Sequence, residues 1–95
     1  MRETAFEFYL RADPDIKTEL SIVTRIRLAK EAEAVLQTQL DAIVADDDRM
    51  YEALIELKKH DSIRGKMQNA LRKYYIFCNG KEFPRIKRYH SLKHP

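Results

Sequence analysis

Helix-breaking residues are scarce in this sequence. Its 95 residues include only 2 Gly and 3 Pro, and it has no low-complexity run. A disordered chain would contain more such residues and fewer aliphatic ones, whereas 44% of this chain is hydrophobic. A chain of this length can bury one modest core. Helix-forming residues dominate its composition, and clusters of β-branched residues are few. We therefore expect a single all-α domain.

Cysteine is nearly absent, since only Cys78 is present. It cannot form a disulfide within the chain, so there is no disulfide framework of the kind that small secreted domains use. The first residues lack the charged and apolar segments of a signal peptide. No run approaches the roughly 18 apolar residues that a membrane span needs. We expect a soluble, cytoplasmic protein with no membrane partner.

Recognisable catalytic motifs are also missing. The sequence has no His-Glu-x-x-His motif, no glycine-rich phosphate loop and no Gly-x-Ser-x-Gly nucleophile elbow. Cys78 falls at the end of a predicted helix, the pole that disfavours a thiolate, so we expect a small apolar core residue there. We therefore predict that the protein is not an enzyme and needs no cofactor.

The histidines and acidic residues are not spaced along the sequence as in known metal sites. His60, His90 and His94 are too irregularly placed for a recognisable zinc site. The acidic run at residues 46–48 lacks the alternating ligands, central Gly and distal Glu of a calcium-binding loop. Acidic side chains at the start of a helix accept hydrogen bonds from free amides, so this run predicts a helix N-cap and no metal site.

Apolar residues at helical spacing predict a compact bundle of four main helices in residues 1–84, followed by a basic tail in residues 85–95. The first helix covers residues 3–10 and ends before Pro14. The second begins near Thr18 or Ser21 and reaches residue 36 or 37, a short helical turn follows at residues 40–44, and the third helix ends at His60. The expected buried residues of the first two helices are Ala5, Phe6, Tyr9, Leu10, Leu20, Val23, Ile26, Ala29 and Leu36.

The fourth helix, which begins near Met67 and is closed by Gly80, organises this bundle. Met67, Ala70, Leu71, Tyr74 and Cys78 fall on one apolar face. Gly80 suits the left-handed conformation that ends many helices. Beyond it, Phe83, Ile86 and Tyr89 recur every three residues, so this segment is expected to lie back on the bundle before residues 91–95 become disordered.

Charge is distributed very unevenly along the chain. Residues 1–63 carry 9 Lys and Arg against 14 Asp and Glu, a net charge of −5. Residues 64–95 carry 9 Lys and Arg against one acid, Glu82, a net charge of +8. The basic excess favours an anionic partner for the C-terminal third. The alternative is that the two parts neutralise each other within the fold.

The basic residues of the C-terminal third are interleaved with tyrosines, a pattern typical of nucleic-acid binding. Lys and Arg bind phosphates by displacing counterions, while tyrosines add hydroxyl donors and stacking faces. We therefore predict contacts to double-stranded DNA. The predicted DNA-binding residues are Arg64, Lys66, Arg72, Lys73, Tyr75, Lys81, Arg85, Lys87 and Arg88.

Three segments carry a family resemblance: residues 16–36, residues 40–44 (Leu-Asp-Ala-Ile-Val) and residues 68–77 (Gln-Asn-Ala-Leu-Arg-Lys-Tyr-Tyr-Ile-Phe). Their order and spacing are similar to the SAM-like core-binding N-terminal domain of phage-integrase-type tyrosine recombinases. The resemblance spans residues 3–80. It implies a helical domain that packs against duplex DNA, with Arg72 and Lys73 at the Arg/Lys positions of the last-helix pattern.

The chain also departs from that family. Its 95 residues leave no room for the larger domain with the catalytic Arg, His and Tyr, so recombinase activity is not expected. The second helix carries Glu19, Glu31 and Glu33, which is more acid than a DNA-facing helix favours. The alternative function is a helical protein–protein interaction module, an adaptor or inhibitor, whose acidic part or apolar seam meets another chain. The sequence predicts no oligomeric state.

Overall fold

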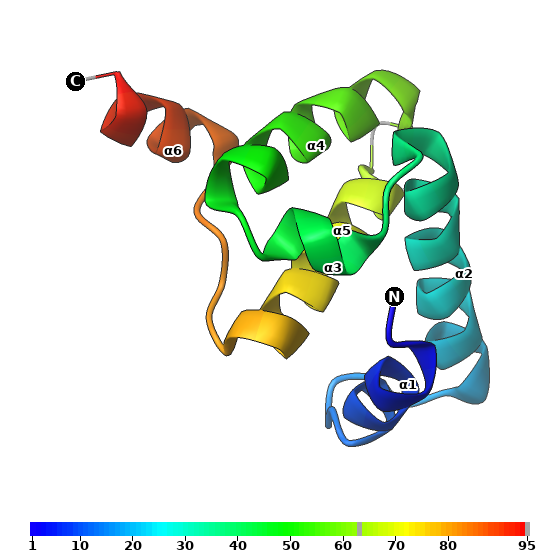
Figure 1. Ribbon diagram of the computed structural model, residues 1–95. Helices are drawn as coiled ribbons and strands as arrows, with labels where there is room; N and C mark the ends of the chain where they lie inside the picture. The colour runs from blue at the N-terminus through cyan, green and yellow to red at the C-terminus, as the bar shows by residue number, and fades with distance from the viewer. Residues whose placement is uncertain (63, 95) are drawn as a thin grey trace.

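The computed structural model describes residues 1–62 and 64–94, and this part of the chain contains six helices and no strand. In chain order the helices are α1 (Glu3–Arg11), α2 (Glu19–Leu36), α3 (Leu40–Val44), α4 (Asp47–His60), α5 (Lys66–Asn79) and α6 (Ile86–Lys93) (Figure 1). The predicted all-α class is confirmed. The four main helices correspond to α1, α2, α4 and α5, and α3 is the predicted short turn. No helix in the described residues is long and apolar enough to cross a membrane.

The predicted helix ends are confirmed by their capping geometry. The Thr18 side-chain oxygen accepts a hydrogen bond from the Ser21 backbone N–H at 3.1 Å, at the start of α2. Asp46 Oδ1 accepts from the backbone N–H of Asp48 at 2.9 Å and of Arg49 at 3.2 Å, at the start of α4. Gly80 ends α5 with a φ of 72°, where a side chain would be strained. These contacts satisfy backbone groups that have no partner within the helix.

Asp61 joins the end of α4 to the start of α5. Its backbone N–H donates to the carbonyl oxygen of Leu57 at 2.8 Å. Its carboxylate accepts from the backbone N–H of Met67 at 2.8 Å and of Gln68 at 2.9 Å. Asp61 therefore ends α4 and caps the start of α5.

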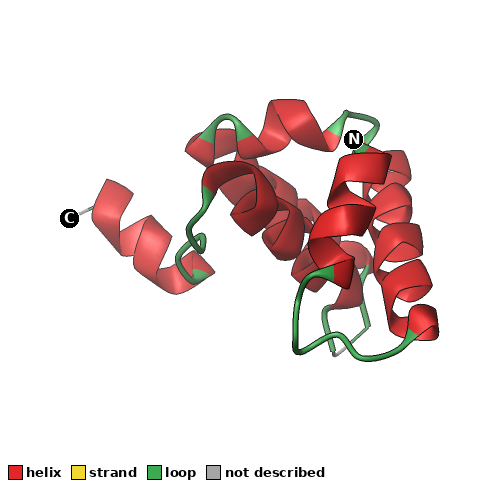
Figure 2. Ribbon diagram, turned by 90° about the horizontal axis from the view of Figure 1, so that it is seen from below, coloured by secondary structure: helices red, strands yellow, loops and turns green. Residues whose placement is uncertain are grey.

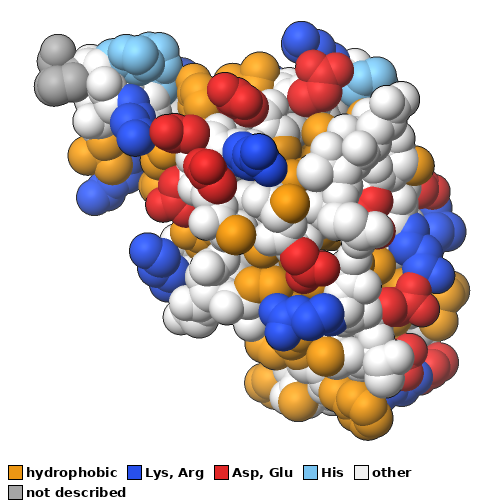
Figure 3. Space-filling view, viewed as in Figure 1, with side chains coloured by type: hydrophobic (Ala, Val, Ile, Leu, Met, Phe, Trp, Pro, Cys, Tyr) orange, Lys and Arg blue, Asp and Glu red, His pale blue; other side chains and the backbone are white. Residues whose placement is uncertain are grey.

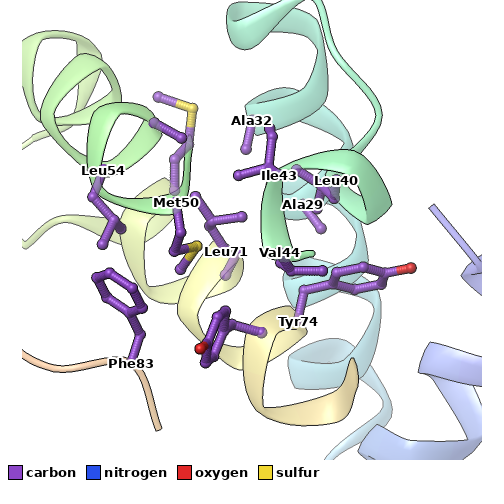
Figure 4. Close-up of a cluster of buried hydrophobic side chains, with 14 of the residues drawn as sticks. Ala29, Ala32, Leu40, Ile43, Val44, Met50, Leu54, Leu71, Tyr74 and Phe83 are labelled. Atoms are coloured by element: carbon purple, nitrogen blue, oxygen red, sulfur yellow. The ribbon is translucent and has the colours of Figure 1, made fainter. Parts of the chain in front are cut away.

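α5 is the central element of the core and packs against α1, α2, α3 and α4. Its predicted apolar face is buried, with Leu71 and Tyr74 fully inaccessible. Figure 4 shows these side chains together with Val44 of α3 and Met50 of α4. Cys78, at the end of the same face, is half-buried. The organising role predicted for this helix is confirmed.

The predicted inward face of α2 is partly wrong. Leu20 and Val23 are 74% and 52% exposed, while Ile22, Ala29 and Ala32 are buried. α2 carries apolar side chains on more than one side, so periodicity alone does not select the face that meets the core. The structure places the small alanines there, where they permit close packing of the helices.

α1 follows its prediction except at one position. Phe6 and Leu10 are fully buried and Tyr9 is half-buried, as expected. Ala5 is exposed. A short helix can bury only one narrow stripe, and Phe6 and Leu10, four residues apart, already define it.

The segment predicted as a basic tail forms α6. Phe83 and Tyr89 are only 4% and 7% exposed, so the prediction that this segment lies back on the bundle is confirmed. Residues 91–93, expected to be disordered, complete the helix, and Pro95 lies outside the described residues. α6 lies at the end of the molecule opposite to α1 and α2 in both ribbon views (Figures 1 and 2), and the chain extends 42 × 26 × 23 Å.

Candidate nucleic-acid interface

The nine residues predicted to contact DNA fall into an exposed and an internal group. The exposed residues are Arg64, Lys66, Lys81, Arg85, Lys87 and Arg88, and the half-buried or buried residues are Arg72, Lys73 and Tyr75. All three members of the internal group lie on α5, where the packing of four neighbouring helices leaves little free surface.

Arg72 uses its charge within the protein. Its Nη1 atom donates to the carbonyl oxygens of Phe83 at 2.9 Å and Pro84 at 3.2 Å. The guanidinium carbon lies 5.9 Å from the centre of the Phe83 ring. Burial lowers the pKa of Arg72, as expected for a cation that has lost part of its hydration. Arg72 therefore fixes the segment that leads into α6.

Lys73 pairs with an acid from the N-terminal half. Its Nζ atom lies 2.5 Å from Asp13 Oδ2, and the two side chains are only 27% and 14% exposed. The Lys73 hydrogen bond, followed by one from the backbone N–H of Asp15, lowers the pKa of Asp13. Nζ also lies 5.5 Å from the centre of the Tyr9 ring. At this position the acidic and basic parts of the chain do neutralise each other.

Tyr75 is a core residue, which corrects the expectation that it offers a hydroxyl donor and a stacking face to DNA. It is 2% exposed, and its hydroxyl donates to Asp47 Oδ1 at 2.8 Å. Burial, reinforced by this hydrogen bond, raises the pKa of Tyr75 to about 12. The ring packs edge-on against Phe83 with centres 5.2 Å apart.

Two further tyrosines repeat this arrangement. The Tyr74 hydroxyl donates to Asp41 Oδ1 at 2.5 Å, and the Tyr89 hydroxyl donates to Asp48 Oδ1 at 2.6 Å. Burial and the Asp41 hydrogen bond raise the pKa of Tyr74, while the hydrogen bond to Asp48 raises that of Tyr89. The three Tyr–Asp bonds tie α5 and α6 to the acidic starts of α3 and α4.

One side of α6 is fixed on α4. Besides the Tyr89 bond, Lys93 Nζ lies 3.2 Å from Asp48 Oδ1, and the Tyr51 hydroxyl lies 3.1 Å from His90 Nδ1. The rings of Tyr51 and Tyr89 are 5.2 Å apart between centres. Figure 3 shows carboxylates and cations side by side where α6 meets the body of the molecule.

The start of α6 presents cations to solvent. Arg85 stands at its N-cap, and Lys87 and Arg88 follow in the first turn. All three are exposed, and none forms an ion pair with a carboxylate elsewhere in residues 1–62 and 64–94. Leu92, 64% exposed, lies one turn beyond Arg88.

The structure does not bring the six exposed cations into one surface. Arg64 and Lys66 lie at the start of α5, whereas Lys81 and the α6 cations follow its end. The 14 residues of α5 correspond to a length of about 20 Å. The cations near α6 therefore form the larger group, with Arg64 and Lys66 separate from it.

Sequence reasoning missed the partners that hold the internal group. Lys73 and Asp13 are 60 positions apart, and Tyr75 and Asp47 are 28 apart. No local pattern signals such pairs, because they form only when the helices pack. Lys93 was also not identified, although its ion pair with Asp48 helps to hold α6.

Comparison with known proteins leaves the resemblance untested: no family model matches the sequence, and no curated protein or solved structure matches it. The similarity to the core-binding domain of tyrosine recombinases remains a prediction from the sequence. In the part of the chain that the structure describes, no group of three or more His, Cys, Asp or Glu side chains is arranged to hold a metal ion.

Proposed function

We propose that the protein binds double-stranded DNA, without catalysing a reaction on it, through the exposed cations at the start of α6 and the segment before it. The observation that carries this proposal is the group formed by Arg85, Lys87 and Arg88, which are exposed and lack a carboxylate partner in the described residues. Lys and Arg in this state gain free energy from phosphates by releasing counterions from the DNA.

The setting of these cations supports phosphate contact. α6 has 8 residues, about 12 Å of helix, and lies at one end of the molecule, where a duplex can approach it (Figure 1). Tyr89 and Lys93 anchor α6 on α4, so the cations are presented on a fixed element. Arg72 contributes by holding the carbonyls of Phe83 and Pro84, which is a positioning role.

The test measures the anisotropy of a short labelled duplex at several salt concentrations. Replacing the three cations together (R85Q/K87Q/R88Q) should weaken binding on all sequences alike. It should reduce the slope of log affinity against log salt by about one unit per lost phosphate contact. The control K17Q/R49Q/K58Q removes the same charge from exposed cations on α4 and in the connection before α2, and it should keep the wild-type slope.

Two results would contradict this function. Wild-type protein that fails to bind duplex DNA even at low salt would exclude it. An equal loss in the two triple variants would show that net charge, and no particular surface, determines the affinity.

A protein-interaction module is the second candidate, favoured by the exposed apolar side chains of α1 and α2. Phe8 and Leu20 are 70% and 74% exposed. The helices that carry them are joined by Arg11, whose two terminal nitrogens each lie 2.6 Å from a Glu19 oxygen. The double variant F8Q/L20Q, compared with wild type by sedimentation velocity at two concentrations, tests whether these side chains meet a second copy of the chain.

A further inference from the structure

A surface groove of about 490 Å³ lies between α2 and α5, on residues that the proposed DNA contact through α6 does not use, although Lys66 and Lys73 were among the DNA-binding residues predicted from the sequence. On α5 it is lined by Lys66, Asn69, Ala70 and Lys73, which share one side of the helix over two turns. The groove therefore follows α5 for about 10 Å. Its volume falls within the range of about 300–1,000 Å³ typical of small-molecule sites.

The floor of the groove is apolar. Ile16, in the connection between α1 and α2, and Ala70 are 8% and 4% exposed, and Leu28 of α2 is half-buried. Thr24 and Asn69 add a hydroxyl and an amide to the walls. A ligand body that lies on this floor would be mainly hydrophobic, with a few polar contacts at its edge.

The charged lining has one cation in excess, with three cations against the carboxylates of Asp13 and Asp15. Lys73 is paired with Asp13, and Arg25 lies near enough to the same carboxylate to contribute to its lowered pKa.

Arg25 and Lys66 form no ion pair within 4.0 Å in residues 1–62 and 64–94. Arg25 Nη1 makes only a long contact of 3.4 Å with the Ser21 carbonyl oxygen. Each of these two cations is therefore free of an ion pair in the described residues and can accept an anionic group.

From this arrangement we infer that the groove binds a small organic anion, a molecule with a single phosphate or carboxylate group on an apolar body. Arg25 and Lys66 would hold the anionic group, and Ile16, Leu28 and Ala70 would contact the body. DNA is a poorer occupant, because its closely spaced phosphates would also lie against Asp13 and Asp15. The inference does not depend on the proposed DNA contact.

The experiment follows backbone amide signals of the whole chain by two-dimensional NMR during titration with 1-naphthyl phosphate. Two matched probes, 1-naphthol and inorganic phosphate, carry the body and the anionic group alone. We expect saturable shifts of the amide signals of Thr24, Asn69 and Ala70 with 1-naphthyl phosphate. 1-Naphthol and inorganic phosphate should each bind at least about tenfold more weakly.

Substitutions then assign the contacts. The variant R25Q/K66Q should bind 1-naphthyl phosphate about tenfold more weakly and leave the response to 1-naphthol unchanged. The control R49Q/K58Q, which removes the same charge from α4, should bind like wild type. N69W places a bulky ring in the groove from an exposed position, so it should block the probe without disturbing the core.

Several outcomes would overturn the inference. One is the absence of saturable shifts in wild-type protein. Another is a set of shifts centred on the exposed Phe8 and Leu20, which would place the probe on the apolar surface of α1 and α2. Equal affinity of wild type and R25Q/K66Q, both folded by their signal dispersion, would exclude the two cations as the anion contact.

Discussion

The cations of α5 and those around the start of α6 look alike in the sequence and have different roles in the structure. Arg72 and Lys73 are both half-buried. Arg72 donates hydrogen bonds to the carbonyl oxygens of Phe83 and Pro84, and Lys73 forms an ion pair with Asp13. Arg85 and its neighbours on α6 face solvent without an acidic partner in the described residues. The neighbours that folding supplies therefore decide whether a basic residue serves the fold or remains free for a partner.

This difference resolves the two interpretations of the charge asymmetry by region. On α5, Asp13 of the acidic part neutralises Lys73, whereas Lys66 at the start of the same helix has no ion pair in the described residues. Around α6, Lys93 is paired with Asp48, but Arg85, Lys87 and Arg88 have no ion pair in the described residues. The unpaired cations of the described residues therefore include those around the start of α6 (Arg85, Lys87 and Arg88) and those at the groove between α2 and α5 (Arg25 and Lys66).

The largest expected effect is a difference in stability between variants that truncate one leucine of α5 and one leucine of α6. Leu71 of α5 is fully buried and Leu92 of α6 is 64% exposed. Leu71→Ala should lower the free energy of unfolding by about 2–5 kcal/mol, because it leaves a cavity in a packed core. Leu92→Ala should change it by less than about 0.5 kcal/mol. Chemical denaturation measures both, and similar losses would mean that α6 is packed as tightly as α5.

The next effect compares one arginine from each region. Arg72→Met should destabilise the protein by about 1–3 kcal/mol, since two carbonyl oxygens lose a charged donor while the apolar part of the side chain is kept. Arg85→Met removes an exposed charge and should stay within about 0.5 kcal/mol of wild type. Urea unfolding curves give both values. If the two variants were equally stable, the contrast between internal and external cations would fail.

A smaller effect concerns alkaline pH. The pKa of Tyr75 is raised from 10.0 to about 12, so its contribution to stability is fully present below pH 10. As pH rises from about 10 toward 12, the unfolded chain loses this proton first, and stability should fall. The Tyr75→Phe variant should lose less stability over this interval, measured by denaturation at stepwise pH. Identical pH profiles for the two proteins would contradict the burial of this hydroxyl.

The smallest effect is expected at Cys78, at the end of α5. Its sulfur lies 3.1 Å from Arg2 Nη2, and the residue is half-buried. Cys78→Ser keeps a hydrogen-bond acceptor of similar size, so stability should change by less than about 1 kcal/mol. DNA affinity, measured by anisotropy, should be unchanged, since the thiol has no predicted role in binding. A loss of affinity with an unchanged melting curve would show that Cys78 acts in function.

Much of the fold could be predicted because its signals are local. The caps of Thr18 and Asp46, the break near Pro14 and the stop at Gly80 each depend on a few adjacent residues. The buried face of α2 could not be predicted, because periodicity alone fits a buried face that contains Leu20 as well as one that contains Ile22. Only the packing of α5 against alanines selects one side.

The candidate site was less predictable for the same reason. Exposure of Lys87 and Arg88 agrees with their sequence context, in which no acid lies nearby. The internal roles of Arg72 and Tyr75 depend on Pro84 and Asp47, which lie 12 and 28 positions away. A pattern of basic and aromatic residues shows which side chains could bind phosphates, and tertiary contacts decide which are accessible.

The bridge made by Asp61 has a consequence for how the protein opens. A fluctuation that unwinds the end of α4 releases its bond to Leu57, and the same displacement withdraws the carboxylate from the amides of Met67 and Gln68. The last turn of α4 and the first turn of α5 should therefore exchange their amide hydrogens with deuterium as one cooperative unit. α6, whose main contacts are with α4 alone, should exchange earlier and independently.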